Sequence, residues 1–225
     1  MKKRIWNIGY IVITIVLIVL ISLLGINYYN NKQLEKEVKK IKETDINNYK
    51  YDSKTTTYFE YKKVEVAIKE YMRDYSNYIN KINSIINEEN VKNVLSINNF
   101  EKDGKDFNNS ISLINKKKKE LEDATNKLYE LNNENKILEY IEKKSVSKKY
   151  KDLYKKYMFN KEDLENNKEK IKQLNEKANN ILDTDLQVLT LLKNNKDLWK
   201  IEEGKVGFYS NNLINQYNEL VNKLK

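Results

Sequence analysis

The segment from Lys143 to Tyr157 carries the residue types that could bind a polyanion. Three tyrosines lie among its lysines, and Asp152 is its single acidic residue. The lysines are Lys143, Lys144, Lys148, Lys149, Lys151, Lys155 and Lys156. Ammonium groups interleaved with aromatic rings suit a phosphate-rich polymer or an anionic lipid surface. The segment is therefore a candidate binding patch for teichoic acid or anionic lipid, or for nucleic acid if the domain is cytoplasmic.

The same segment also has a purely structural interpretation. Ser145-Val146-Ser147 is typical of a joint between helices, and in the helix that follows Tyr150, Leu153, Tyr154 and Tyr157 would face a core. Lysine is abundant throughout the chain, whose formal net charge is +9. Lys, Asn, Ile and Tyr have AT-rich codons, which indicates a bacterial genome of low GC content rather than selection for a basic surface. We favour the structural interpretation and keep the binding patch as the alternative.

The chemistry available elsewhere in the chain is sparse. There is no histidine and no cysteine, which removes the commonest general base, the commonest metal ligand and any thiolate. Most acidic residues occupy the polar positions of amphipathic patterns, where nothing would shift their pKa. No glycine-rich phosphate loop, nucleophile elbow or metal motif occurs. We therefore expect no enzyme, no cofactor, no metal site and no small-molecule substrate.

Two short acidic stretches match cation sites only in part. Asn99, Glu101, Asp103 and Gly104 fit the first, third, fifth and sixth positions of a calcium loop, but the twelfth position would be Ser110, where a bidentate glutamate is required. Asp183 and Asp185 lack a third oxygen donor, and helix capping explains both of them. Neither stretch is expected to hold a cation.

The elements that must position these residues begin with an apolar run from Ile5 to Ile26. No charged side chain occurs in its 22 residues, which as a helix would span roughly 33 Å and match a hydrocarbon core of about 30 Å. Residues suited to the membrane interface lie at its ends, Trp6 and Tyr10 at one and Tyr28 and Tyr29 at the other. The run predicts a transmembrane helix over residues 5–26, with the lipid bilayer as its partner.

A cleaved signal peptide is the competing interpretation of this run. The apolar part of a signal peptide usually has about 7–15 residues and ends in a small-x-small cleavage pattern. The run here is longer, and Ser22-Leu23-Leu24-Gly25 has leucine at one of the two small positions. We therefore favour a retained anchor.

The charges that flank the run indicate its orientation. Lys2, Lys3 and Arg4 favour a cytoplasmic N-terminus, residues 1–4. Lysines also follow the run within about 15 residues, but long domains translocate largely regardless of charge. We expect the protein in the cell membrane with its C-terminal domain extracytoplasmic. An inverted anchor with a cytoplasmic domain is the alternative.

The remaining chain is expected to be helical. The absence of proline and the presence of only five glycines favour long helices. Residues 27–57 are expected to form a stalk and linker, residues 58–195 a helical bundle, and residues 196–225 a β-hairpin with a C-terminal helix packed on the bundle.

The most regular pattern occupies residues 58–87. Its apolar residues follow a 3-4-3-4 spacing, which is typical of a bundle helix. They are Tyr61, Val64, Ile68, Tyr71, Tyr75, Tyr78, Ile82 and Ile85. The four tyrosines could stack on sugars or bases, but at heptad positions we expect them to pack inward.

Further helices are expected over about 106–144 and 161–182, with another piece after Asp183-Thr184-Asp185. Polar residues interrupt the apolar stripe of the first and indicate contact with solvent or with another element; they include Lys118, Thr125, Asn132 and Asn135. Alternating apolar residues around a glycine-containing turn predict a hairpin from Trp199 to Phe208. Ser210 is expected to cap the last helix.

Together these patterns predict an all-α protein. An N-terminal transmembrane helix would be followed by an elongated antiparallel helical bundle or coiled-coil domain with a small β-hairpin near the C-terminus. For function, we expect a non-enzymatic, single-pass envelope protein whose extracytoplasmic domain serves protein–protein interaction or scaffolding, through a protein partner or self-association. The alternative is a polyanion-binding, ligand-binding or sensor-type helical module, with an anionic polymer as its partner.

Overall fold

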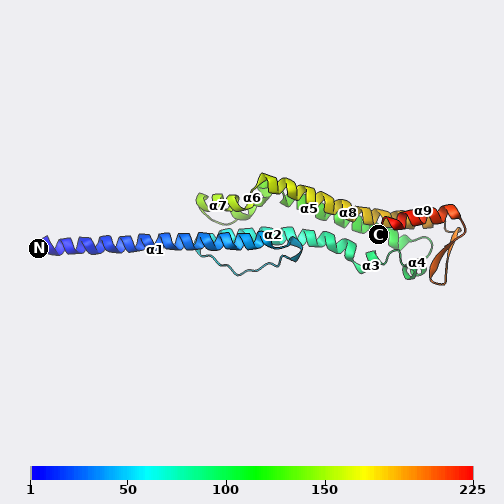
Figure 1. The fold of residues 1–225 in the computed structure, drawn as a ribbon, viewed down its shortest axis with the longest axis horizontal. Helices are drawn as coiled ribbons and strands as arrows, with labels where there is room; N and C mark the ends of the chain where they lie inside the picture. Colours follow the sequence, from blue (N-terminus) through cyan, green and yellow to red (C-terminus); the bar gives the residue numbers. More distant parts are fainter. Residues whose placement is uncertain (1, 225) are drawn as a thin grey trace. The chain divides into compact units, whose positions relative to one another are not determined.

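A computed structural model describes the backbone of residues 2–224 and the side chains of residues 14–224. The chain divides into two compact units, whose helices are labelled in Figure 1. The first unit comprises Met1–Arg73 and Ile137–Asn160, and the second comprises Asp74–Lys136 and Lys161–Lys225. Each unit is described by itself below. The predicted division into stalk, bundle and end-piece stays a prediction.

The all-α fold with a hairpin near the C-terminus is confirmed. The elements are α1 (Lys2–Glu43), the short 3-10 helix Ile46–Asn48, α2 (Phe59–Asn87), α3 (Glu89–Lys92), α4 (Ile97–Asp103), α5 (Asn108–Leu131), α6 (Glu134–Glu142), α7 (Lys148–Met158), α8 (Lys161–Asn194), β1 (Trp199–Glu202), β2 (Lys205–Phe208) and α9 (Asn211–Asn222). Helix α2 begins in the first unit and ends in the second, and its bounds match the expected 58–87 to within one residue.

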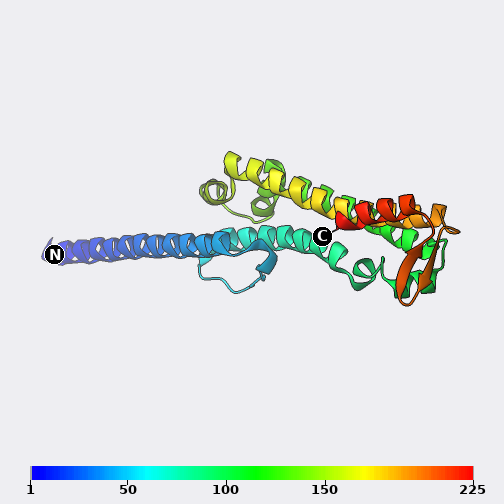
Figure 2. The same ribbon diagram turned by 45° about the vertical axis from the view of Figure 1, so that its right-hand side comes forward.

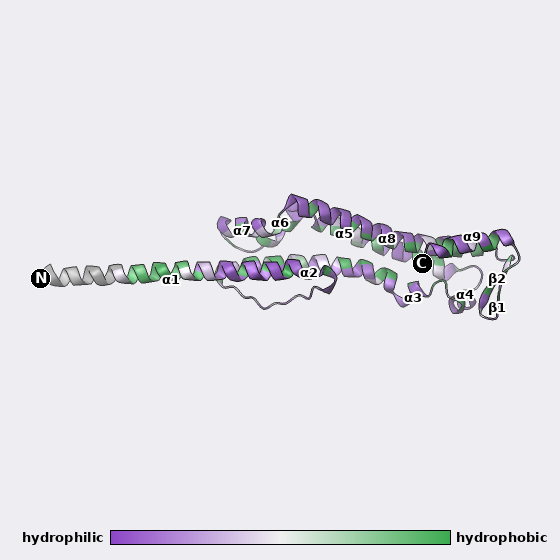
Figure 3. Cartoon of the chain, viewed as in Figure 1, coloured by the Kyte–Doolittle hydropathy of each residue, from purple (hydrophilic) through white to green (hydrophobic). Residues whose placement is uncertain are grey.

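Helix α1 combines an exposed apolar part with a packed polar part. From Thr14 onward it is the one helix among the described residues that is long and apolar enough to cross a membrane. Figure 3 shows this part of α1 as hydrophobic. Its apolar side chains between residues 15 and 24 lie exposed, whereas Leu34, Val38 and Ile41 are buried in the first unit. The side chains of Trp6 and Tyr10, predicted at the membrane interface, lie outside the described residues.

In the first unit α1 and α2 run in the same direction. The connection 44–58 returns alongside α1 before α2 begins (Figure 2). The backbone N–H of Tyr58 donates to Asn30 Oδ1 at 2.7 Å, and Lys69 Nζ pairs with Glu37 Oε1 at 3.1 Å. The paired residues are separated by 28 and 32 positions in the sequence, and this nearly constant offset is the signature of parallel helices.

A buried charge cluster joins α1, α2 and the connection between them. Lys69 is 3% exposed and Glu65 is 1% exposed, and their charged groups lie 2.9 Å apart. Lys69 Nζ also donates to the carbonyl of Lys54 at 2.7 Å. Glu65 accepts from the backbone N–H of Thr57 at 3.1 Å and from its hydroxyl at 2.8 Å. The cluster thereby holds the connection against both helices.

The pKa values of this cluster show that the charged forms are stabilised. Burial alone would raise the pKa of Glu65, but hydrogen bonds from Lys69 and Thr57 outweigh it and leave that pKa lowered. Burial alone would lower the pKa of Lys69, but its hydrogen bonds to Glu65 and Glu37 leave that pKa raised. Both groups are therefore ionised at neutral pH, as a paired buried charge must be.

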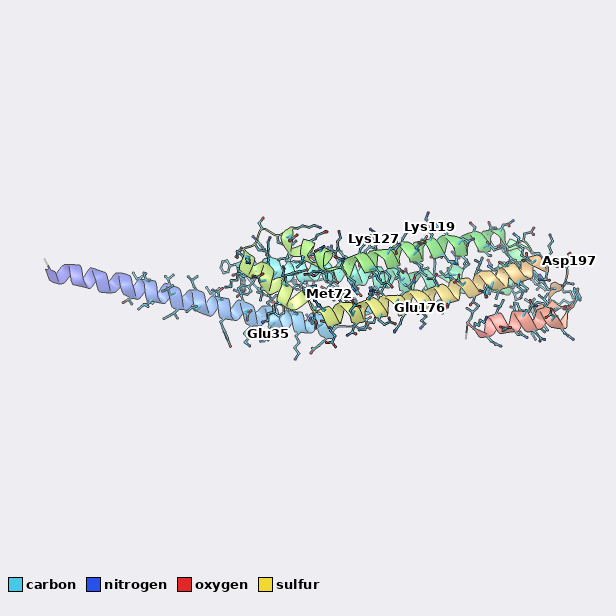
Figure 4. The ribbon with its side chains drawn as sticks, turned by 90° about the horizontal axis from the view of Figure 1, so that it is seen from above. Glu35, Met72, Lys119, Lys127, Glu176 and Asp197 are labelled. Atoms are coloured by element: carbon cyan, nitrogen blue, oxygen red, sulfur yellow. The ribbon has the colours of Figure 1, made fainter. Side chains whose placement is uncertain are left out.

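In the second unit α5 and α8 pack antiparallel (Figure 4). Lys118 forms an ion pair with Asp183, Thr125 donates to Asn175 Oδ1 at 3.0 Å, and Asn132 donates to the carbonyl of Leu164 at 2.8 Å. The residue numbers rise along α5 as those of their partners fall along α8, which shows that the two helices run antiparallel. The polar residues that interrupt the apolar stripe of α5 are therefore contacts with α8.

Two helix boundaries differ from those expected. The single helix predicted over 106–144 is divided into α5 and α6, because Asn133 Oδ1 accepts from the backbone N–H of Asn135 and begins a new helix. Conversely, α8 continues without a break through Asp183-Thr184-Asp185. The capping role expected for these two aspartates is therefore wrong: Asp183 pairs with Lys118, and Asp185 is buried.

The predicted hairpin is confirmed, with Trp199 opposite Phe208 and Ile201 opposite Val206. Its turn residues, Glu203 and Gly204, have φ values of 47° and 70°, as a two-residue I′ turn requires. Trp199 is buried against the rings of Phe100 and Phe107.

Two hydrogen bonds of Trp199 hold β1 against neighbouring parts of the second unit. The indole N–H of Trp199 donates to the carbonyl of Leu192 at 2.8 Å, and Lys105 Nζ donates to the Trp199 carbonyl at 2.8 Å. Ser210 caps α9, as predicted, by accepting from the backbone N–H of Leu213. The hairpin therefore rests on α4, α5 and α8 of the second unit rather than standing alone.

Removal of the Lys69 charge tests the cluster that joins α1 and α2. We expect Lys69→Met to destabilise the first unit by about 3–5 kcal/mol, because Glu65 and Glu37 would remain buried without their partner. Hydrogen exchange of the purified full chain in detergent should accelerate across residues 44–58. The control Lys39→Met removes an exposed ion pair with Glu43 and should cost less than about 1 kcal/mol. Equal effects of the two substitutions would contradict the role given to the cluster.

Candidate functional site

The lysine–tyrosine segment forms the joint that follows α6, residues 143–147, and most of α7. Its tyrosines face inward: Tyr154 is fully buried and its hydroxyl donates to the carbonyl of Ile137 at 2.9 Å. The ring of Tyr150 meets that of Tyr61 edge to face at 5.0 Å. Burial raises the pKa of Tyr150, Tyr154 and Tyr157, so their hydroxyls are neutral donors at neutral pH. The packing expected for these aromatic residues is thus present.

The fold separates the seven lysines of the segment into two groups. Lys144 Nζ lies 2.7 Å from Glu70 Oε2, and Lys143 Nζ lies 3.9 Å from Glu139 Oε2. These two ammonium groups therefore already have acidic partners. Binding of a polyanion by the segment stays a prediction. We expect Lys143 and Lys144 to contribute least to such binding.

The other five lysines lie on the outer side of α7 and are named here the basic face: Lys148, Lys149, Lys151, Lys155 and Lys156. Four are exposed and Lys151 is half-buried. In the part of the chain that the structure describes, no carboxylate lies within ion-pair distance of them, and Asp152 is the only acidic residue of α7. The basic face therefore carries an excess of positive charge over the single acidic residue of its own helix.

Contacts within the first unit hold α7 against the beginning of α2. The backbone N–H of Ser147 donates to Glu60 Oε1 at 3.2 Å, and Lys63 Nζ donates to the carbonyl of Ser145 at 2.7 Å. Since Tyr58 is bonded to Asn30 of α1, α7 lies near the turn of α1 that follows the apolar run. The sequence pattern gave no indication of this placement.

The tyrosine stripe of α2 is packed rather than open for stacking. Tyr61, Tyr71 and Tyr75 are buried, and Tyr78 is half-buried. The ring of Tyr71 meets that of Tyr140 edge to face at 5.5 Å. The inward packing predicted for these residues is confirmed, so the stripe offers no surface on which sugars or bases could stack.

The buried cluster of Lys69, Glu65 and Glu37 was not anticipated from the sequence. A signal was present, because Glu65 and Lys69 are four residues apart and each follows a buried residue of the apolar stripe, Val64 and Ile68. Charged residues next to an apolar stripe in this spacing can be partly buried and paired. Lys69 pairs with both carboxylates, and Lys69 and Glu65 are also bonded to the backbone of the connection, so the cluster supports the fold rather than chemistry.

Asp183 and Asp185 of α8 lie in different surroundings. Asp183 pairs with Lys118, whereas Asp185 is only 5% exposed and burial raises its pKa to about 7. Among the described side chains, residues 14–224, no group of three or more His, Cys, Asp or Glu is arranged to hold a metal. Asp185 is instead a source of pH-dependent stability in the second unit.

Substitution of Asp185 tests this pH dependence. Its pKa rises from 3.8 to about 7 on folding, so the folded chain binds the proton more tightly and loses stability as the pH rises through that window. At the upper end of this pH range the free energy of unfolding has fallen by on the order of 4 kcal/mol. We expect Asp185→Asn to remove the dependence. Urea unfolding in a Trp6→Phe background, where Trp199 is the only tryptophan, reports on the second unit.

The matched control is Asp183→Asn, because Asp183 is on the same helix but is half-exposed and paired. This variant should keep the pH dependence of the unsubstituted chain. If Asp185→Asn and the unsubstituted chain lose stability in parallel between pH 4.5 and 7.5, the burial of Asp185 does not control the stability of this unit.

The comparisons with known proteins give no relative. No protein-family model matches this chain, and no curated protein or solved structure matches it either. Any function proposed for it therefore rests on the contacts, burial and charges described above.

Proposed function

We propose that this chain is a single-pass membrane protein without enzymatic activity that presents an extracytoplasmic helical body to a protein partner, as a scaffold or spacer. The main support is the continuity of α1, which is one uninterrupted helix from Lys2 to Glu43. Its apolar part is exposed and suited to lipid, while its second part is buried in the first unit. Anchor and body thus share a helix, with no flexible linker between them.

The contacts after the apolar run also favour a retained anchor over a cleaved signal peptide. Asn30 is buried, and its Nδ2 donates to the carbonyl of Ile26 at 2.9 Å while its Oδ1 accepts from Tyr58. Cleavage directly after the run would remove that carbonyl from the helix. The basic residues Lys2, Lys3 and Arg4 support a cytoplasmic N-terminus.

An incompletely covered apolar surface supports the presentation of the body to a protein. In α9 only Leu213 is buried, whereas Tyr217, Leu220 and Val221 are half-buried. The exposed apolar residues of the same region are Leu198, Tyr209 and Ile214. Together we name them the α9 surface. Apolar surface left open in this way is typical of an interaction site.

The basic face favours a second candidate function, a polyanion-binding or sensor-type helical module. Its five lysines lack acidic partners, and a phosphate-rich polymer would be attracted to them. Such binding would weaken steeply as salt is added, because counterions compete for the lysines. Binding through the apolar α9 surface would depend on salt much less.

The orientation is tested by labelling a single cysteine. The chain has no cysteine of its own, and Lys127 is exposed on α5 (Figure 4), so Lys127→Cys gives one reactive site in the body. We expect a membrane-impermeant maleimide to label it in intact cells. The control is the same variant labelled after lysis. Labelling only after lysis would contradict the extracytoplasmic orientation and support the inverted anchor.

The protein partner is tested by photocrosslinking in the membrane. A photoreactive residue at Ile214, in the α9 surface, should give one stoichiometric crosslinked product, either to another protein or to a second copy of this chain. The control position is Glu176, which is exposed on the polar side of α8 and should give none. Absence of a product from Leu198, Tyr209 and Ile214 alike would count against the scaffold role.

A further inference from the structure

Exposed aromatic side chains gather where α1 leaves its apolar part. Tyr28 is 68% exposed on α1, and Tyr58 and Phe59 are 60% and 73% exposed at the beginning of α2. The Tyr58 backbone is bonded to Asn30, four residues after Ile26 and thus about 6 Å along the helix axis. All three rings therefore lie close to the end of the apolar run.

The backbone of Phe59, one of these exposed aromatic residues, is strained. Its φ of 56° lies in the left-handed region, which a bulky aromatic residue rarely adopts. No described ring contact involves it, and its side chain projects into solvent rather than into the core. A strained residue that exposes an apolar ring has no evident role in the packing of the first unit. Such a ring suits the boundary between headgroups and acyl chains.

The basic face lies in the same region of the first unit. Ser147, directly before α7, is bonded to Glu60, which follows Phe59. Tyr150 of α7 contacts Tyr61 of the same turn of α2. The beginning of α7, which carries the basic face, is therefore held against the turn of α2 that directly follows the exposed rings. Lysines within a Debye length of about 8–10 Å of an anionic surface are attracted to it.

We propose that the basic face and the exposed rings of Tyr58 and Phe59 dock on anionic lipid headgroups of the leaflet from which α1 emerges. The proposal rests on the membrane anchor put forward above and deepens it. The interfacial and headgroup zone on each side of the hydrocarbon core is about 5–7 Å thick, which matches the height of Tyr58 above Ile26.

A lipid surface explains two features that a soluble polymer leaves without a role. A polymer needs the lysines but not an exposed phenylalanine, whereas a lipid surface takes up both the charge and the apolar ring. The continuity of α1 also delivers the basic face to the bilayer with no entropy lost in bringing the two together. The first unit is thereby held at the membrane surface rather than free to tilt away from it.

The test uses the full chain reconstituted in vesicles, with a fluorophore on an Asp152→Cys variant, which places it on α7 beside the lysines. Spin-labelled lipid quenches the fluorophore when α7 contacts the surface. We expect at least twofold more quenching with 30% phosphatidylglycerol than with phosphatidylcholine alone, and a return to the lower value in 500 mM salt. Equal quenching in both vesicles would overturn the proposal.

Two matched variants separate the basic face from general charge. Glutamine at all five lysines of the basic face should remove the effect of phosphatidylglycerol. The control carries glutamine at five exposed lysines of α5 and α8 and should keep it: Lys116, Lys119, Lys168, Lys170 and Lys172. Loss of the effect in both variants would show that net charge, not α7, is responsible, and would overturn the proposal. Circular dichroism checks that each variant is folded.

A third variant tests the rings. Tyr58→Ser with Phe59→Ser should reduce the quenching by about half in phosphatidylglycerol vesicles while the salt dependence persists. Unchanged quenching would overturn the part of the proposal that assigns these rings to the interface. Binding of soluble polyphosphate to the basic face without lipid-dependent quenching would identify a polymer site and overturn docking.

Vesicle flotation distinguishes failure of the docking from failure of the anchor. A chain that floats with vesicles in 500 mM salt but shows no phosphatidylglycerol-dependent quenching retains its anchor and lacks the docking contact. A chain that no longer floats in high salt contradicts the proposed membrane anchor itself.

Discussion

The buried ammonium group of Lys69 imposes the arrangement of the first unit. An ammonium group withdrawn from water must be paired and hydrogen-bonded, or its burial costs several kcal/mol. Its partners come from three places: Glu65 on its own helix, Glu37 on α1 and the carbonyl of Lys54 in the connection. Satisfying them together requires the connection to return along α1 before α2 begins. The parallel course of α1 and α2 is therefore a consequence of one desolvated charge.

This return of the connection places the beginning of α2, rather than its end, near the exposed apolar part of α1. In an ordinary antiparallel helix hairpin α2 would begin beside Glu43. The connection instead carries its beginning back to Asn30, a distance of 13 residues or roughly 20 Å along α1. Helix α7, which is bonded to Glu60, is displaced by the same amount. Without the return, the basic face would lie roughly two Debye lengths farther from the exposed apolar part of α1, and the proposed attraction to anionic lipid would be screened.

Patterns that depend on neighbouring residues were predictable from the sequence. The 3-4-3-4 spacing predicted α2 because burial of one helix face is a local property, and the glycine-containing turn predicted the hairpin because it requires φ > 0 at Gly204. Contacts between distant residues were not predictable. Asp183 lies within α8 and pairs with Lys118, 65 residues away, and Lys69, which holds the connection, pairs with Glu37, 32 residues before it. Residue spacing along one helix carries no information about such partners.

The same limit applies to the candidate site. Lys144 and Lys148 occur in similar sequence surroundings, yet Lys144 is neutralised by Glu70, 74 residues away, whereas Lys148 lies on the open side of α7. The sequence could indicate a basic segment, but only the fold reduces seven lysines to the five that remain available. The sequence of the basic segment cannot identify its partner, because lysines alone do not distinguish a polymer from a lipid surface. The proposal of a lipid surface rests instead on the exposed apolar part of α1, which ends near Asn30, and on the exposed ring of Phe59, which follows the residue bonded to Asn30. Electrostatic attraction decays within about 10 Å in salt, so the position of a basic helix, rather than its composition, decides which anion it meets.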